Sequence, residues 1–320
     1  MPRILLISDI HGNIEALEAV AERLKEEEFN RAYCLGDYVG YGPNPNETIE
    51  LLLAMEEGGI EMRHNIGNHD AAAIGACEFV NIRNQQTLAR VMEEGEFASQ
   101  LEIIQAYKNQ ETRKYIPVKA DAEETINWTV ERMTDTTREF LSTRLEERID
   151  IMEGVISVHA SPRDVSFEYI RDDQSALKVF ESNTMDNVKI CFHAHTHFPV
   201  VWSLPAEERM SYGGSIIIMG EVSSTHEAFV ELDSSNLYLI NVGSVGQPRG
   251  DDRRPTYVIY DSEAMTVQFH RVEYDSSPTI QKIQDAGLSD DLVSRLLPHD
   301  VVEIDEDVVE MDDDDEDFDG

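Results

Sequence analysis

The first quarter of the chain alternates short apolar runs with longer amphipathic stretches. Residues 3–8 form an apolar, partly β-branched run, which predicts a buried strand. In residues 14–28 apolar side chains recur every three or four positions, so one face of a helix would be buried there. A strand followed directly by an amphipathic helix is the first half of a βαβ unit.

The same alternation repeats twice more. Residues 31–37 predict a second short strand, and residues 46–59 predict a helix that Asn46 could cap and that ends at two glycines. Residues 60–70 predict a third strand that runs into a loop. Strands separated by helices favour an α/β fold with a mostly parallel sheet.

The pattern changes after this region. Residues 71–148 are rich in Ala, Gln, Glu and Arg and predict several helices. Strand patterns then return, which predicts a sheet-rich second half with antiparallel hairpins; they lie at residues 154–162, 187–197, 215–220, 228–233, 237–246, 255–261 and 266–275. Residues 279–297 predict a C-terminal helix or a pair of helices.

Composition narrows the class of protein. The 320 residues are 41% hydrophobic and 28% charged, which is typical of a globular chain. No apolar run approaches the roughly 20 residues of a membrane helix, and no signal peptide is evident. Three scattered cysteines suit a reducing compartment. We therefore expect a cytoplasmic protein without a membrane partner.

The chain is strongly acidic, with a formal net charge of −38. The last twenty residues contain twelve acids and no base, and residues 301–320 are expected to be a solvated, disordered tail. A field of this sign repels nucleic-acid phosphates, so a DNA or RNA partner is disfavoured. The charge leaves the oligomeric state open.

Polar residues that can bind metal follow five of the predicted strands. They are Asp9 and His11 in "SDIHGN", Asp37 in "LGD", Asn68 and His69 in "GNHD", His159 in "SVHASP", and the histidines of "HAHTH". Ligands of open α/β sheets bind beyond the carboxyl ends of strands, so these motifs predict one site. Mixed imidazole and carboxylate groups favour transition metals over calcium.

The "HAHTH" motif places His193, His195 and His197 at alternate positions. In a continuous strand they would share one face at about 6.6 Å spacing. The residues alone therefore leave open whether all three bind metal.

Taken together, the motifs are those of a known family. "SDIHGN", "LGDYVGYGPNP", "GNHDAAA", "VHASPRD", "AHTHFPV" and "NVGSVGQPR" resemble the calcineurin-like metallophosphoesterase superfamily. The resemblance is strongest to its small bacterial and archaeal branch, often described by similarity to diadenosine tetraphosphatase or phosphodiesterase. It implies a four-layer α/β/β/α sandwich of two mixed sheets flanked by helices.

The resemblance also implies a dinuclear metal site. One metal would be held by Asp9, His11, Asp37 and His197, and the other by Asp37, Asn68, His159 and His195. Asp37 would bridge the two ions, and His193 would be left as a neighbour or core residue. The metals could be Mn, Fe, Zn, Ni or Mg, because all tolerate nitrogen and oxygen ligands.

The implied activity is hydrolysis of a small phosphoester, of which nucleotides are one class. Two divalent cations can clamp both sides of an in-line displacement and generate a bridging hydroxide near neutral pH. His69 matches the histidine that protonates the leaving oxygen in the family. The expected protein is a dinuclear metal-dependent phosphoric ester hydrolase.

One departure bears on the substrate. Protein phosphatases of the superfamily carry an acid and an arginine after the bridging aspartate, whereas this chain has Gly40 and Tyr41 there. The absence of this acid and this arginine disfavours protein phosphatase activity and symmetric diadenosine tetraphosphate hydrolysis. It slightly favours a phosphodiester over a phosphomonoester as the substrate.

The expected domain organisation follows from the motif spacing. A metallophosphoesterase domain would span residues 1–275, with a helical insertion at about 83–120 and a β-rich insertion at about 203–236. Residues 276–300 would form a C-terminal helical segment. Both insertions could overhang the site or be surface decoration.

Three polar residues remain open as substrate contacts. Asn13 could touch substrate or cap the helix that begins at Ile14. Arg163 could bind phosphate or form a surface ion pair, and Arg249 is a phosphate-binding candidate in "GSVGQPR". The alternatives to a phosphoesterase are a non-catalytic protein-binding scaffold on the same fold and, less favoured by the charge, a nuclease.

Overall fold

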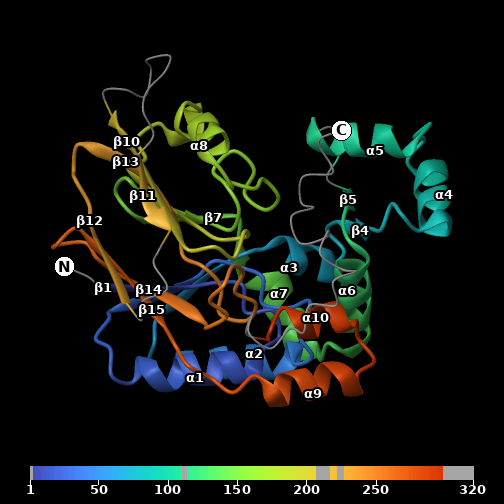
Figure 1. Cartoon of the computed structure of the whole chain (residues 1–320), viewed down its shortest axis with the longest axis horizontal. Helices are drawn as coiled ribbons and strands as arrows, with labels where there is room; N and C mark the ends of the chain where they lie inside the picture. Colours follow the sequence, from blue (N-terminus) through green and yellow to red (C-terminus); the bar gives the residue numbers. More distant parts are fainter. Residues whose placement is uncertain (1–2, 110–111, 113, 207–216, 222–226, 298–320) are drawn as a thin grey trace.

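The computed structural model describes residues 3–109, 112, 114–206, 217–221 and 227–297. Two mixed sheets form its centre (Figure 1). The first contains, in spatial order, β12 (Glu227–Glu231), β15 (Thr266–Arg271), β14 (Thr256–Asp261), β1 (Arg3–Ile7), β2 (Arg31–Cys34), β3 (Met62–Asn65) and β6 (Leu145–Glu146). The second contains β11 (Ile217–Glu221), β10 (Val200–Pro205), β13 (Asn236–Asn241), β9 (Ile190–His193), β8 (Val155–Val158) and β7 (Arg148–Met152).

Alternating side chains of β1 show how the layers are stacked. Ile4 and Leu6 pack in the core between the two sheets, where they meet residues of β9, β13 and β14. Leu5 and Ile7 point the other way and pack against the helices α1 (Ile14–Leu24) and α2 (Pro45–Glu57). Both faces of a strand are thus buried, which explains why the run is apolar throughout.

The second sheet is covered on its outer face as well. Residues of β8, β9 and β10 pack there against α8 (Asp173–Phe180) and the short 3₁₀ helix at Asn183–Met185. The order of layers is therefore helices, sheet, sheet, helices. The predicted four-layer α/β/β/α sandwich is confirmed.

The parallel strands set the position of the site. β1, β2 and β3 are parallel neighbours in the first sheet, and β8, β9 and β13 are parallel neighbours in the second. The carboxyl ends of parallel strands lie at one edge. The loops that carry the polar motifs therefore leave both sheets at the same edge.

The prediction that Asn46 caps the second helix is wrong. That helix begins at Pro45, with Asn44 as its N-terminal flanking residue. Proline suits the first position of a helix because its missing N–H would have no helical partner there. Asn46 instead accepts hydrogen bonds from Thr134 N (2.9 Å) and Thr137 Oγ1 (2.8 Å), and so ties α2 to α7 (Asp135–Thr143).

Residues 83–120, predicted as a helical insertion, contain α4 (Gln85–Glu94), α5 (Gln100–Lys108) and β5 (Tyr115–Pro117), which pairs with β4 (Glu78–Val80). These elements lie beside the sandwich rather than within it (Figure 1) and have a small core of their own around Val91, Ile103 and Tyr115. The segment at 203–236 contributes β11 and β12, one to an edge of each sheet.

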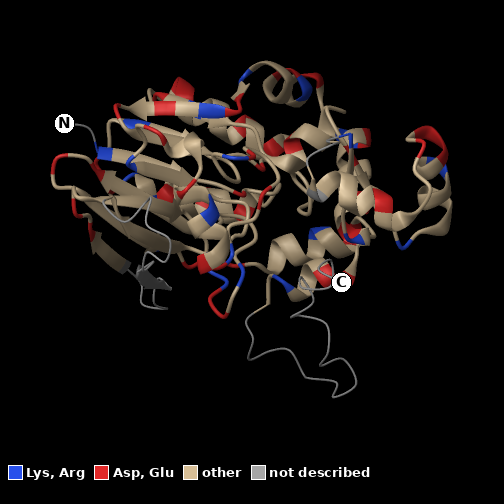
Figure 2. Ribbon diagram, turned by 90° about the horizontal axis from the view of Figure 1, so that it is seen from above, with Lys and Arg blue, Asp and Glu red and all other residues tan. Residues whose placement is uncertain are grey.

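Two short helices follow the sheets, α9 (Ser277–Asp285) and α10 (Asp290–Ser294), as the C-terminal pattern predicted. The predicted tail at 301–320 lies outside the described residues. No helix within the described ranges is long and apolar enough to cross a bilayer. Acidic residues are spread over strands and helices alike (Figure 2), which agrees with the net charge of −38.

Candidate metal centre

The loops after the parallel strands bring the predicted metal-binding residues together. Asp9 follows β1, Asp37 follows β2, and Asn68 opens α3 (Asn68–Ala73) just after β3. His159 follows β8 directly, and His195 and His197 follow β9. All seven residues that the sequence singled out as metal ligands are buried. They are Asp9, His11, Asp37, Asn68, His159, His195 and His197.

The backbone at five of these residues has an unusual conformation. Their φ angles are positive, which side-chain-bearing residues seldom adopt and which costs about 1–2 kcal/mol each; they are Asp9 (49°), His11 (48°), Asp37 (56°), His195 (67°) and His197 (63°). Such residues concentrate at functional sites, where the surrounding structure holds them in place. The chain turns sharply at each position and aims the side chain inward.

One cluster forms around Asp9. Its members, Asp9, His11, Asp37 and His197, each offer a ligand atom, and these atoms lie within 4.8 Å of one another. Nε2 of His11 lies 3.2 Å from Nε2 of His197. Asp9 Oδ1 lies 3.4 Å from His197 Nε2, and Asp37 Oδ2 lies 3.6 Å from His11 Nε2. Nitrogen and oxygen lone pairs thus converge on one small volume.

A second cluster shares Asp37 with the first. It consists of Asp37, His159 and His195. His159 Nε2 lies 3.4 Å from Asp37 Oδ2, 3.2 Å from His195 Nδ1 and 3.1 Å from Asn68 Oδ1. The same oxygen of Asp37 therefore faces imidazoles of both clusters, as a bridging carboxylate would.

Backbone carbonyls orient three of the imidazoles. Nδ1 of His11 bonds to Val39 O (3.1 Å), Nδ1 of His159 to Leu35 O (2.8 Å) and Nδ1 of His197 to Gln247 O (2.6 Å). A carbonyl accepts only, so each Nδ1 carries the proton and each Nε2 lone pair points into the cluster. Carbonyl partners of this kind fix the tautomer of metal-binding histidines.

The surroundings of the Asp9 carboxylate indicate whether the clusters suit a cation. It is completely buried, yet neither oxygen has a hydrogen-bond partner within the described structure. Burial, opposed by His159, raises the pKa of Asp9 to about 8. An unpaired buried carboxylate is costly unless a positive charge neutralises it. The donor set therefore fits a divalent metal ion.

His69 lies beside the clusters without being part of either. Its ring packs edge-on against His11 (centroids 4.8 Å apart) and at a tilt against Tyr41 (4.5 Å). Among the described residues, its Nδ1 has no hydrogen-bond partner. A Cβ added at Gly40 would stand only 2.3 Å from that nitrogen. Glycine at position 40 thus gives the imidazole its room, and an acid there would collide with it.

His193 is separated from the metal clusters by the end of β9. It is the last residue of that strand, so the alternation expected for a continuous strand stops before His195. Its ring stacks near Trp202 (5.7 Å) and Nδ1 lies 3.4 Å from Asn241 Nδ2. Asn241 in turn donates to Ala194 O (2.7 Å) and Thr196 Oγ1 (2.9 Å). His193 is a core residue next to the amide that braces the "HAHTH" loop.

Asp70 joins the second and third motif loops, a role that sequence reasoning missed. Its carboxylate accepts hydrogen bonds from the backbone N–H groups of Asp37 (2.8 Å), Tyr38 (2.9 Å) and Gly67 (2.9 Å). Burial raises its pKa to about 7. The position of Asp37 thus depends on the Asp70 carboxylate, which accepts its backbone N–H.

We expect Asp70→Asn to destabilise the protein by roughly 2–4 kcal/mol, because an amide –NH₂ would face at least one buried N–H donor. Urea denaturation of purified protein measures the change. Asp150→Asn is the matched control, since that carboxylate is 75% exposed, and it should change stability by less than about 0.5 kcal/mol. Equal stability of the two variants would contradict the bracing role.

Comparison with known proteins identifies the fold family. The model of the family "Calcineurin-like phosphoesterase" matches residues 2–199. The chain belongs to the calcineurin-like phosphoesterase family. The uncharacterized protein MJ0912 of Methanocaldococcus jannaschii is 30% identical over 297 residues, which cover 92% of this chain and 96% of that protein.

Two solved structures have a similar fold. A metallophosphoesterase from Sphaerobacter thermophilus is 31% identical with a TM-score of 0.64, covering 92% of this chain and 98% of that chain. The hypothetical protein PH1004 from Pyrococcus horikoshii has a TM-score of 0.63 at 20% identity, with the same coverage, and shares the fold. The family uses divalent metal ions, and the two Asp and His clusters could hold two of them.

In this phosphoesterase Asn13 caps the first helix. Its Oδ1 accepts from Ala16 N (3.1 Å), and its Nδ2 donates to Gly246 O (2.8 Å) and Tyr274 Oη (3.2 Å). The capping alternative of the sequence analysis is confirmed. Both polar atoms of Asn13 are engaged within the protein, so no substrate contact is proposed for it.

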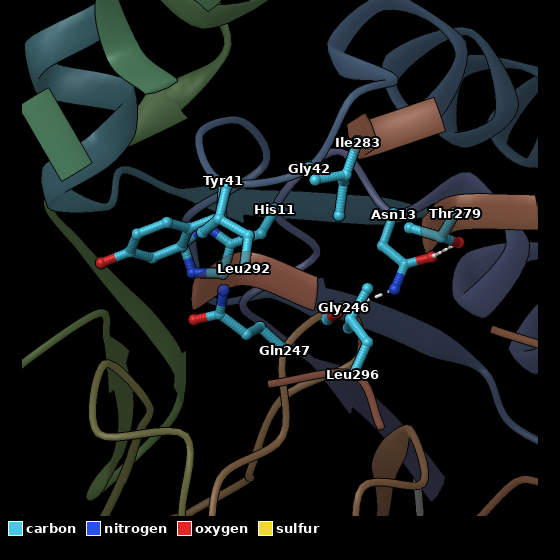
Figure 3. Close-up of a pocket in the computed structure, with 10 residues that line it drawn as sticks. All are labelled: His11, Asn13, Tyr41, Gly42, Gly246, Gln247, Thr279, Ile283, Leu292 and Leu296. Carbon is cyan, nitrogen blue, oxygen red and sulfur yellow. Dashed lines mark hydrogen bonds between the residues drawn. The ribbon is translucent and has the colours of Figure 1, made fainter. Parts of the chain in front are cut away.

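The C-terminal helices close a small pocket next to Asn13 and His11. Ile283, Leu292 and Leu296 form its apolar wall, and Thr279 Oγ1 donates to Asn13 Oδ1 (3.0 Å) (Figure 3). Arg295 lies over the Tyr41 ring (5.3 Å) and pairs with Asp121 (2.5 Å). The C-terminal segment thus supports the side of the centre on which His11 and His69 lie.

The two candidate arginines differ in their placement. Arg163 forms an ion pair with Glu168 (3.4 Å). An ion pair was one of the two roles that the sequence left open for it. Arg249 follows β13, and its backbone N–H donates to His197 O (3.5 Å). Burial lowers the pKa of His197 well below its ordinary value, and the charge of Arg249 adds to this effect. Arg249 therefore lies near the metal clusters. Contact of either arginine with substrate stays a prediction.

Proposed function

We propose that the protein is a dinuclear metal-dependent phosphoesterase. One ion would be held by Asp9, His11, Asp37 and His197, and the other by Asp37, Asn68, His159 and His195. The observation that carries the proposal is the buried Asp9 carboxylate, which lacks hydrogen-bond partners in the part of the chain that the structure describes and lies 3.4 Å from His197 Nε2. Such a carboxylate is most simply explained by a bound cation.

When bound, two divalent cations supply Lewis-acid stabilisation of phosphoryl oxygens and an activated water molecule. The chain's own residues hold the geometry. Asp37 couples the two halves of the site through one oxygen, and its other oxygen accepts from His69 N (2.9 Å). That bond places the His69 ring at a fixed position relative to the bridging carboxylate.

His69 would donate the proton that the leaving oxygen needs. Burial lowers its pKa to about 4 in the free protein, against the opposing effect of Asp37. A phosphoester anion beside the ring would favour the imidazolium and raise this pKa. Substrate binding would therefore shift His69 toward the protonated form that general acid catalysis needs.

We expect His69→Ala to lower kcat by roughly 10²–10⁴-fold while both metals stay bound, because His69 lies outside both clusters. Hydrolysis of 4-nitrophenyl phosphate and bis(4-nitrophenyl) phosphate with added manganese measures activity, and elemental analysis measures metal. If the metal-loaded wild type hydrolyses no phosphoester faster than His69→Ala, the proposed function fails.

The substrate would be a small phosphoester, with nucleotides as one class for the test panel. A cytoplasmic location is also proposed. It is supported by Cys34, Cys77 and Cys191, which are all buried and unpaired, as is usual in a reducing compartment.

A further inference from the structure

An aromatic ring and a guanidinium group are stacked in series on His195. The Tyr169 ring lies 3.9 Å from the His195 imidazole, centroid to centroid, with an interplanar angle of 27°. The guanidinium carbon of Arg171 lies 4.0 Å from the centre of the Tyr169 ring. Because imidazole and guanidinium are equally close to the ring centre, they must occupy its opposite faces.

This stack reaches from the second metal cluster to the surface. His195 is 4% exposed, whereas Tyr169 is 37% exposed and Arg171 is exposed. The guanidinium carbon is less than 8 Å from the imidazole centre, since the two contacts share one ring. A positive charge is thus held at the rim of the site, on the face of the Tyr169 ring that points away from His195.

The loop that carries the stack is firmly anchored. Ile170, between the two stacked residues, is completely buried in the core beneath the second sheet's outer face. Arg171 N donates to Ser175 Oγ (3.0 Å) at the start of α8. The loop begins at His159, and Ala160 N donates to Val165 O (2.9 Å). The side chains of Tyr169 and Arg171 therefore start from fixed backbone positions.

A second arginine lies near the same "HAHTH" loop. The backbone N–H of Arg249 donates to His197 O (3.5 Å). The two come from different loops, one before α8 and one after β13. In a chain of net charge −38, two arginines near one site create a local positive potential, which attracts anions.

We propose that Arg171, held on the Tyr169 ring, binds the phosphoryl oxygens of the substrate on the His195 side of the site. Together with Arg249 it would favour a doubly charged phosphomonoester over a singly charged phosphodiester. The inference rests on the proposed function for its substrate, but its test does not need turnover.

The test measures binding of inorganic phosphate to the manganese-loaded full chain by titration calorimetry. We expect Arg171→Gln to weaken phosphate binding roughly 10-fold, as loss of a charge-assisted hydrogen bond does. Arg148→Gln is the matched control, because Arg148 pairs with the exposed Asp150 on β7, and it should change the affinity less than about twofold. Metal content and thermal midpoint are recorded for each variant.

Variants of Tyr169 distinguish the contribution of its aromatic ring to phosphate binding from that of its hydroxyl group. Tyr169→Phe keeps the flat face and should bind phosphate like the wild type, whereas Tyr169→Leu should resemble Arg171→Gln. In parallel, the kcat/KM of Arg171→Gln should fall more for 4-nitrophenyl phosphate than for bis(4-nitrophenyl) phosphate.

Each outcome separates the two proposals. If Arg171→Gln binds phosphate as the wild type does, or if the metal-loaded wild type binds none, the role of Arg171 is wrong. If phosphate binding depends on Arg171 but no phosphoester is hydrolysed, the role of Arg171 stands and the proposed function falls. If hydrolysis is found without dependence on Arg171, only the further inference falls.

Discussion

Asp37→Asn should abolish turnover, with a loss of roughly 10³-fold or more in kcat, and should leave the protein with fewer than two metal ions. The substitution keeps the size of the side chain and removes its charge. One oxygen of Asp37 lies 3.6 Å from His11 Nε2 and 3.4 Å from His159 Nε2. No other residue in the described chain belongs to both clusters.

The size of the expected fall in kcat follows from the metal chemistry that Asp37→Asn would weaken. Lewis-acid stabilisation by bound metal is worth several kcal/mol, and each 1.4 kcal/mol corresponds to about tenfold in rate. An amide binds cations more weakly than a carboxylate and could present its –NH₂ group to one cluster. Both ions should therefore be held less tightly.

Elemental analysis of protein purified without chelator, together with turnover of the two aryl phosphoesters, measures the effect. Asp150→Asn provides the control, because it removes one charge from an exposed position. Circular dichroism verifies that Asp37→Asn is folded. A folded variant that retains two metal ions per chain would refute the bridging assignment.

The three histidines of "HAHTH" should behave differently from one another. His195→Ala and His197→Ala should each lose a metal ion and most activity, whereas His193→Ala should keep both ions. His195 and His197 belong to different clusters. Each supplies a nitrogen within 3.2 Å of another imidazole nitrogen, His159 Nε2 and His11 Nε2 respectively.

His193→Ala should instead reduce stability by about 2–5 kcal/mol, because it empties a completely buried site beside Trp202. The milder His193→Gln keeps a hydrogen-bonding group near Asn241 and should lose less. Urea denaturation and elemental analysis of the four variants distinguish the two kinds of effect. Loss of a metal ion from folded His193→Gln would contradict the assignment of His193 as a core residue rather than a metal ligand.

Much of the site was predictable from the sequence because the relevant signals are local. Each ligand lies within four residues of the end of a short strand, and strands alternating with amphipathic helices imply parallel pairing. Parallel strands have their carboxyl ends at a common edge, so Asp9 and Asp37 had to be neighbours once β1 and β2 were recognised. The apolar character of β1 on both faces likewise indicated a strand between two layers.

Other features depended on contacts between distant segments. Asp70 was visible in the "GNHD" motif, but its bonds to Asp37 N and Tyr38 N cross 33 and 32 residues of chain. Tyr169 and Arg171 carried no motif, and their relation to His195 exists only because the loop before α8 folds back over β9. The Gln247 carbonyl that orients His197 is 50 residues away.

By itself, the sequence determined the α/β class, the order of the strands that end at the site and the chemical kinds of ligand available there. The tertiary structure decided which nitrogen of each imidazole points inward, why His193 differs from its two neighbours, and which carboxylate braces the bridging aspartate. The reason is physical. Strand and helix patterns arise from side chains a few residues apart, whereas a cluster of buried charges depends on where the loops of two sheets meet.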